Sequence, residues 1–383
     1  MKNNHLAFLT WLRALAAMLV VVDHSVRIAA TRYFAEDPVS VNAAIQFFDI
    51  GTFAVDLFFA LSGCTLYISY SERLRGAGDA GRFYVARIFR IWPAFAFSLL
   101  VYLLFIEFFK YFYVGGTNLW IAQFLHHYSL LNVIQYLSLT FNFTGPRDLF
   151  IGPYWSLPVE FQYYLLLPIA LLIMRHIKFG FLVPLVFGAA LYFIYQKHSL
   201  PVNRYEVFKM GFTFFGGVLL AHAYTKTIFR MPFRIAAVGV ALMIFGAGAV
   251  RCGLIGFPDH WRFVSDHENL FGLLGLGAVM FALFSAPVES HSPAAKFFSR
   301  YGEISYSVYL FHMLFVGIAA LLIMKLHMHD YASKFLFAAL FTFALSYMFS
   351  NWSYNYIEKP SMEMGRRLSM MFSLKNSRAG GEA

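Results

Sequence analysis

The chain has 383 residues, of which 60% are hydrophobic and only 13% are charged, and its formal net charge is +10. Soluble domains carry about 25% charged residues, so this composition excludes an ordinary soluble protein and indicates that lipid is the main solvent. The basic excess fits the loops that orient a membrane protein, and it does not require a nucleic-acid partner.

Apolar runs of about 20 residues, the length that crosses a bilayer as a helix, recur along the whole chain. We therefore expect an all-α, polytopic membrane bundle of about ten transmembrane helices. The first run holds charged residues, and no small-residue cleavage site follows it, so we interpret it as a span rather than a signal peptide. The expected spans lie near residues 8–29, 47–69, 93–113, 154–174, 179–197, 207–225, 233–254, 268–287, 301–325 and 333–353.

Basic residues gather in the segments that follow the even-numbered spans, which favours cytoplasmic N- and C-termini. The apolar segment 119–143 is interrupted by histidines and asparagines, and a further span there would move the later basic segments outside. We interpret it as an interfacial or re-entrant outer segment. Residues 1–362 then form one membrane domain, and the polar residues 363–383 form a short cytoplasmic tail that we expect to be disordered.

The first span contains Arg13, Asp23, His24 and Arg27. Ionisable residues inside a membrane are costly and usually face the bundle interior or a watery cavity. His24 follows Arg13 by eleven positions, about three helical turns, so both lie on one face roughly 16 Å apart. Imidazole exchanges protons near neutral pH, which suits a catalyst. The alternative is that His24 fills a buried hydrogen bond and Arg13 snorkels.

Other polar residues interrupt the later spans. Asp56 lies near the middle of the second span, ahead of a Ser62-Gly63 pair typical of tight helix packing, and it is either functional or a hydrogen-bond acceptor. Glu160 lies about two turns inside the fourth span. It is expected to serve as an acid–base partner or as the ion-pair mate of an intramembrane base. In the ninth span, Tyr309 lies one turn before His312 on the same side.

Arg87 and Arg90 are spaced i, i+3 on an expected short amphipathic helix that ends at Trp92-Pro93. Two guanidinium groups on one face suit a phosphate-rich ligand. The alternative is plain topogenic charge, or attraction to anionic lipid headgroups. The 13 histidines form no metal-ligand spacing, so no metal site is predicted.

Several of these segments together resemble the acyltransferase-3 family of bacterial inner-membrane proteins. They occur in family order and cover about residues 6–362. The matching features are Arg13 and His24 with ten positions between them, VDLFFALSG at 55–63, Arg87 and Arg90 before IWP, WSLPVE at 155–160, GEISYSVYLFH at 302–312 and YNYIEKP at 354–360.

The resemblance implies ten spans, an acyl-CoA donor, usually acetyl-CoA, and a hydroxyl acceptor on a cell-surface carbohydrate or a lipid-linked glycan. It also implies that Arg13 and His24 are the family's essential pair and that Arg87 and Arg90 are its cytoplasmic arginine motif. We expect His24 to act as general base or to become transiently acylated, with Glu160 tuning it or receiving the proton. We assign His24, Arg13, Glu160 and Asp56 to catalysis, and Arg87, Arg90, Tyr309 and His312 to donor binding.

Two other functions compete with this interpretation. A proton-coupled transporter of a small metabolite or glycan precursor would explain the intramembrane acidic residues and histidines. It would explain neither the arginine pair nor the ordered motifs, and no inverted repeat is visible. A non-catalytic scaffold of a glycan-assembly complex would not need the arginine, histidine and glutamate residues together.

Overall fold

The computed structural model describes residues 2–31, 50–112, 128–144, 151–197, 202–226 and 292–379, with a few isolated positions between these ranges. Within them the chain is almost entirely helical and has no strand, as the sequence predicts. The helices are α1 (Lys2–Ala30), α3 (Gly51–Tyr70), α4 (Ala77–Phe112), α6 (Leu130–Leu137), α7 (Phe141–Thr144), η2 (Gly152–Trp155), α8 (Ser156–His176), α9 (Leu182–Lys197), α10 (Val202–Lys226), α14 (Pro293–Glu303), α15 (Ser305–Lys325), α16 (Tyr331–Ser353), η4 (Tyr354–Glu358) and α17 (Lys359–Ala379).

Seven helical segments in the described part of the chain are long and apolar enough to cross a membrane. The expected spans near residues 233–254 and 268–287 lie outside the described residues, so the count of ten and the orientation of the termini stay predictions. α9 is a shorter apolar helix. The seven segments are Phe8–Ala30, Gly51–Tyr70, Ala77–Phe112, Gly152–His176, Val207–Lys226, Ser305–Lys325 and Tyr331–Met371.

The third expected span is part of a longer helix than the sequence indicates. A short amphipathic helix was expected to end before Pro93, but α4 runs unbroken through this residue for 36 residues. A proline removes one hydrogen bond from a helix, and within a membrane bundle neighbouring groups compensate for that loss. Arg87 and Arg90 therefore belong to the same continuous helix as the membrane span.

The chain also stays helical beyond the last expected span. α16 continues through the π-helical turn η4 into α17, so the tail that was predicted to be disordered is largely helical. α17 packs along α4, and a Cβ atom on Gly365 would overlap the side chain of Phe89. This contact supplies packing that the polar composition of the tail does not reveal.

The described part of segment 119–143 contains the short helices α6 and α7. Ser129 caps α6, because its hydroxyl accepts from the backbone N–H of Asn132 while the Asn132 side chain accepts from the backbone N–H of Ser129. α6 has 8 residues and α7 has 4, too few to cross a bilayer. This finding agrees with a segment that does not span, and its interfacial position stays a prediction.

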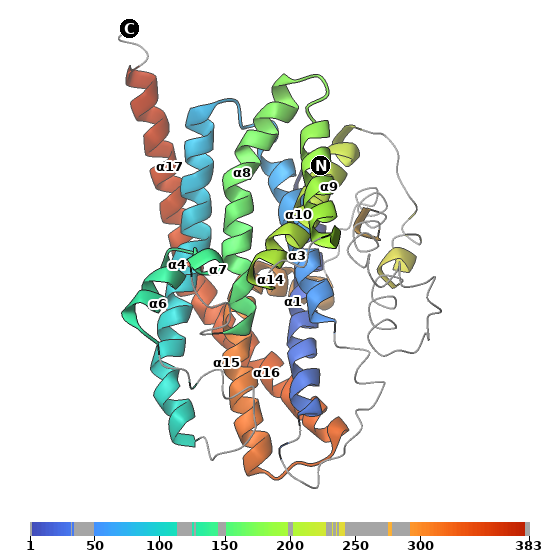
Figure 1. The fold of residues 1–383 in the computed structure, drawn as a ribbon, viewed down its shortest axis with the longest axis vertical. Helices are drawn as coiled ribbons and strands as arrows, with labels where there is room; N and C mark the ends of the chain where they lie inside the picture. Colours follow the sequence, from blue (N-terminus) through green and yellow to red (C-terminus); the bar gives the residue numbers. More distant parts are fainter. Residues whose placement is uncertain are drawn as a thin grey trace.

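Several helix ends meet at one end of the bundle. In Figure 1 the end of α3, the start of α4, the end of α8 and the end of α17 lie together, opposite the turn between α15 and α16. Arg175, at the end of α8, donates to the backbone oxygens of Ser71 and Glu72 at 3.4 and 3.3 Å. The basic segments carried by these ends therefore share one side of the molecule.

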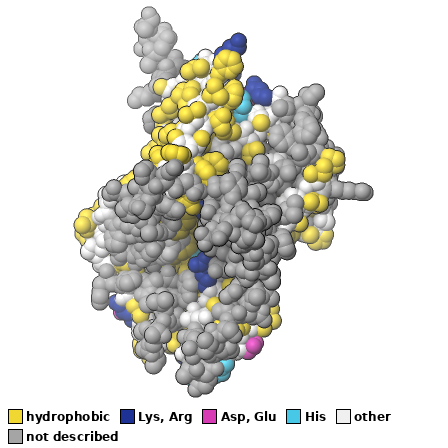
Figure 2. Space-filling view, turned by 45° about the vertical axis from the view of Figure 1, so that its right-hand side comes forward, with side chains coloured by type: hydrophobic (Ala, Val, Ile, Leu, Met, Phe, Trp, Pro, Cys, Tyr) yellow, Lys and Arg dark blue, Asp and Glu magenta, His cyan; other side chains and the backbone are white. Residues whose placement is uncertain are grey.

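The helices divide into an interior group and a lipid-facing group. In its most apolar stretch, α15 buries 83% of its residues, whereas the α16–α17 segment buries 22% and α4 buries 39%. Large exposed apolar side chains follow α4 and α16, such as Leu104 and Leu340. Figure 2 shows hydrophobic side chains over the upper described surface and basic ones at its tip. An apolar surface of this extent suits lipid rather than water.

Glycines bring α3 and α10 into close contact. A Cβ atom on Gly63 would overlap the backbone of Phe214, and one on Gly217 would overlap the backbone of Ala60. Cys64 donates from Sγ to the carbonyl oxygen of Gly217 at 3.0 Å. Small residues that let backbones approach are typical of membrane helix pairs, so the tight packing predicted at Ser62-Gly63 is confirmed.

We predict that Gly63→Ala lowers the stability of the protein by about 1–3 kcal/mol, because the added methyl group forces α3 and α10 apart. The measurement is the thermal unfolding temperature in detergent. Gly81→Ala is the matched control, since nothing lies within 4 Å of its Cβ position on α4. It should unfold at the wild-type temperature or above it. A Gly63→Ala variant as stable as this control would contradict the packing argument.

Candidate functional site

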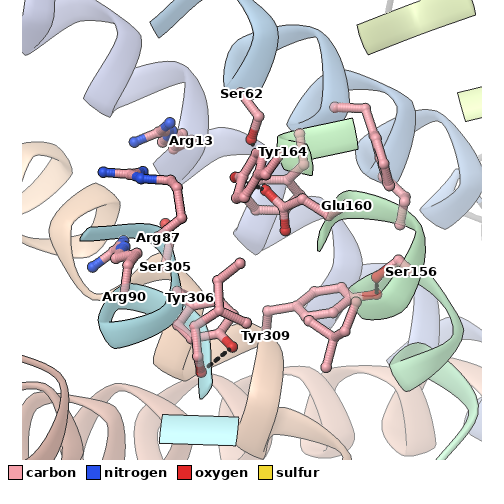
Figure 3. A pocket seen from close by; sticks show the side chains of 15 residues that line it. Arg13, Ser62, Arg87, Arg90, Ser156, Glu160, Tyr164, Ser305, Tyr306 and Tyr309 are labelled. Atoms are coloured by element: carbon pink, nitrogen blue, oxygen red, sulfur yellow. Dashed lines mark hydrogen bonds between the residues drawn. The ribbon is translucent and has the colours of Figure 1, made fainter. Parts of the chain in front are cut away.

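A cavity of about 750 Å³ lies between α1, α3, α4, α8 and α15. This volume includes space open to solvent. Figure 3 shows three arginines along one side and Glu160, Tyr164 and Ser156 across from them. The polar lining consists of Arg13, Arg87, Arg90, Ser62, Ser156, Ser305, Glu160, Tyr164, Tyr306 and Tyr309.

Arg90 is the arginine whose charge is neutralised by the protein. It forms an ion pair with Glu358, which is 1% exposed and belongs to the π-helical turn η4. Ser307 donates to the second oxygen of the same carboxylate at 2.7 Å. The Arg90 guanidinium also lies 5.7 Å from the ring centre of Tyr306. Four partners on α4, α15 and η4 thus hold one another in place.

Arg13 and Arg87 differ from Arg90, because neither has a carboxylate within ion-pair distance among the described residues. Arg87 is held by aromatic rings instead, 5.8 Å from the centre of Tyr70, 5.9 Å from Phe83 and 6.0 Å from Tyr164. Such cation–π contacts orient a guanidinium without neutralising it. Two positive charges in the cavity wall therefore remain available to an anion.

Glu160 faces these arginines from α8. Its Oε1 atom accepts hydrogen bonds from the Ser62 hydroxyl at 2.9 Å and from the Tyr164 hydroxyl. Glu160 was expected to tune His24 or to receive its proton, but it forms no hydrogen bond or ion pair with that residue. The Glu160 carboxylate therefore lines the cavity that contains the arginines and does not contact His24.

His24 packs against a second histidine, His312, with the ring centres 5.0 Å apart. The Nδ1 atom of His24 lies 2.9 Å from the carbonyl oxygen of Val20, and that of His312 lies 2.8 Å from the carbonyl oxygen of Tyr309. A neutral imidazole that donates from Nδ1 carries its lone pair on Nε2. Both rings are therefore set in the tautomer whose Nε2 atom accepts a proton.

The histidine pair and the cavity are separated by one layer of aromatic side chains. Tyr309 lines the cavity, and its ring centre is 5.9 Å from that of His312. The Tyr309 hydroxyl donates to the carbonyl oxygen of Pro153 at 2.6 Å and lies 2.7 Å from the Ser156 hydroxyl. His24 and His312 are absent from the cavity wall. His312 contacts Tyr309, and His24 contacts His312.

Asp23, next to His24 in sequence, joins α1 to α3. One carboxylate oxygen accepts from the backbone N–H of Gly51 at 2.8 Å, and the other lies 3.0 Å from Nε of Arg27. A carboxylate at a helix N-terminus is stabilised by the unpaired N–H groups there. A Cβ atom on Gly51 would overlap this carboxylate. Asp23 and Arg27 thus stabilise the fold at the depth of the histidine pair.

Asp56 lies outside the cavity. It is 4% exposed, and its Oδ2 atom is 3.4 Å from Nζ of Lys209 on α10. The structure therefore does not bring this expected catalytic residue to the arginines. A buried carboxylate beside a buried ammonium is accounted for by pairing between α3 and α10.

Tyr164 and Lys209 lie outside the family motifs, but the sequence around each of them is informative. Tyr164 follows Glu160 by four positions, the spacing at which helical side chains meet. Lys209 is an ionisable residue within an apolar helix, which itself indicates a buried partner. Tyr306 lies within the GEISYSVYLFH motif at 302–312, but only the fold turns it towards Arg90. Among the described residues no group of three or more metal-ligating side chains comes together.

These features define a class: a polytopic membrane protein with a polar, partly cationic site enclosed among its helices. A family model described as an acyltransferase domain, that of the acyltransferase-3 family, matches residues 6–351. The chain therefore belongs to this family and is a membrane acyltransferase. A Rhizobium radiobacter protein named "Protein 2 in picA locus" is 31% identical over 156 residues, which are 38% of this chain and 72% of that protein. No solved structure matches the chain.

We predict a strong energetic coupling between Arg90 and Glu358. Either Arg90→Gln or Glu358→Gln leaves one buried charge uncompensated and should cost about 3 kcal/mol, while the double variant should lose much less than the sum. The measurement is a double-mutant cycle on thermal unfolding in detergent.

The control cycle uses Glu107 and Lys110, an exposed ion pair near the other end of α4. Exposed pairs contribute between zero and about 1 kcal/mol, so little coupling is expected there. Equal coupling in the two cycles would show that the Arg90–Glu358 pair does not organise the site.

Proposed function

We propose that the protein transfers an acyl group, with acetyl the expected one, from cytoplasmic acyl-CoA to a hydroxyl of a cell-surface or lipid-linked carbohydrate, in the bacterial inner membrane. One observation supports acyl-CoA as the donor: the cavity wall contains two arginines that have no carboxylate partner among the described residues. Guanidinium groups bind phosphates through charge-assisted hydrogen bonds. Family membership supports acyl transfer as the reaction.

The cavity wall suggests a division of labour in donor binding. Arg87 and Arg13 hold the phosphates, since their charges are not neutralised by the protein. Arg90 positions the wall through Glu358 and Tyr306. The narrow arm of the CoA molecule then extends along Tyr309 towards His312, with the thioester at its tip.

The acid–base chemistry falls to His24. Its Nε2 atom takes the proton of the acceptor hydroxyl, and the oxygen attacks the thioester carbonyl. The tetrahedral intermediate expels the CoA thiolate, which recovers the proton from the imidazolium, so the products are an ester and free CoA. His312 orients the imidazole of His24 from the side. In the alternative route, Nε2 of His24 attacks the thioester carbonyl and expels the CoA thiolate. The acceptor hydroxyl then attacks the acyl-imidazole, the C–N bond breaks, and the hydroxyl proton ends on the thiolate.

Replacement of His24 by Gln should lower acyl transfer by about 10²–10⁴-fold while leaving CoA binding intact, because a general base acts on the transition state and not on donor affinity. The assay is release of free CoA from acetyl-CoA by purified protein in liposomes with cell-envelope glycans supplied.

His222→Gln is the matched control. This histidine also lies on a membrane helix and is hydrogen-bonded, to the Tyr67 hydroxyl at 2.7 Å, but it is absent from the cavity wall. Wild-type turnover by His24→Gln in folded protein would refute the assignment of the base.

Replacement of Arg87 by Gln should raise the KM for acyl-CoA by about 10- to 100-fold with a smaller effect on kcat, because a charged hydrogen bond contributes about 1.5–3 kcal/mol. The control is Lys110→Gln, which removes a charge from the same helix at an ion pair remote from the cavity. An unchanged KM in Arg87→Gln would contradict the proposal that the donor binds in this cavity.

A further inference from the structure

A second cavity lies at the turn between α3 and α4, at the end of the bundle where the basic segments meet. It encloses about 1,090 Å³, including space open to solvent. None of the sequence motifs includes its residues. Its lining consists of Tyr70, Glu72, Arg73, Leu74, Arg75, Asp79 and Arg82.

The charges of this cavity are only partly paired. Asp79 accepts from the backbone N–H of Arg75 at 2.8 Å and forms an ion pair with Arg82. Its carboxylate therefore closes the turn and the start of α4. The guanidinium groups of Arg73 and Arg75 form no ion pair with the described residues, and both side chains are exposed.

A chain of side-chain contacts joins the second cavity to the first. Tyr70, in its wall, packs edge-on against Phe83 with the ring centres 5.0 Å apart. Arg87 covers both rings at 5.8 and 5.9 Å and lines the first cavity. Arg82 precedes Arg87 on α4 by five residues, a rise of about 7.5 Å. One extended ligand with several phosphates could contact both cavities.

We propose that the second cavity binds the nucleotide end of the acyl donor, with Arg73 and Arg75 holding its 3′-phosphate. This inference rests on the proposed function. CoA carries two groups of phosphate, the 3′-phosphate on the ribose and the pyrophosphate that leads to the arm. Arg87, at the junction of the cavities, holds the pyrophosphate, and Arg73 and Arg75 hold the 3′-phosphate further out. Arginine forks recognise both through charge-assisted hydrogen bonds.

The test compares CoA with 3′-dephospho-CoA, which lacks only the 3′-phosphate. Binding is measured by calorimetry on the full chain in nanodiscs of neutral phosphatidylcholine. Arg73→Gln/Arg75→Gln should weaken CoA binding by about tenfold and leave binding of 3′-dephospho-CoA within about threefold of wild type. Wild-type protein should itself prefer CoA over 3′-dephospho-CoA by a similar factor.

Arg366→Gln/Arg367→Gln is the matched control, because it removes the same charge from an exposed stretch of α17 that does not line the second cavity. It should change neither affinity. An equal loss for both ligands in Arg73→Gln/Arg75→Gln, or no loss for CoA, overturns the second site. Failure of wild-type protein to bind CoA at all would instead overturn the proposed function.

An anionic lipid headgroup offers similar phosphate chemistry at a membrane surface. A second arm therefore repeats the titrations in nanodiscs that contain phosphatidylglycerol. If the lipid abolishes the preference for CoA over 3′-dephospho-CoA in wild-type protein, the arginines bind headgroups and the proposal is wrong. A preference that persists in anionic nanodiscs supports the nucleotide.

Discussion

An ionised side chain inside a bilayer must be paired, hydrogen-bonded or hydrated, and this constraint organises the molecule. Asp23 is satisfied by a helix N-terminus and Arg27, Asp56 by Lys209, and Glu358 by Arg90 and Ser307. Each of these sets joins helices that are distant in sequence, so the polar groups fix the arrangement of helices that apolar packing alone leaves loosely specified. Arg13 and Arg87 stand apart from these sets, and both face the cavity.

α1 connects the two halves of the site. Arg13 lies in the cavity wall, whereas His24, about 16 Å further along the helix, lies against His312. A rigid helix fixes this separation, and Asp23 locks the same stretch of α1 to the start of α3. The eleven-residue spacing of Arg13 and His24 thus fixes the distance between the cationic cavity wall and the histidine pair.

The sequence was most informative where an ionisable residue lies in an apolar segment, because a charge is costly to bury in lipid. Charges in apolar runs predicted that Arg13 and Glu160 serve a polar interior, and the spacing of Arg87 and Arg90 suited a phosphate-rich ligand. The cavity collects all four. The sequence could not foretell which charges neutralise one another, because the pairing of Arg90 with Glu358 joins helices 268 positions apart. For the same reason the sequence did not reveal that Asp56 pairs with Lys209. α4 was misjudged at Pro93 because local helix rules hold less strictly where neighbouring helices surround the backbone.

Tyr309 joins the two halves of the site, because it lines the cavity and its ring contacts His312. Its hydroxyl contacts Pro153 in η2 and Ser156 at the start of α8, and its ring contacts His312 and Phe58. Segments from α3, α8 and α15 therefore converge on one side chain between the arginines and the histidines. In the proposed mechanism, a donor whose phosphates lie at Arg87 brings its thioester past this ring before His24 acts on an acceptor. Under that proposal, the wall around Tyr309 selects the acyl groups that reach the base, while the arginines select the donors.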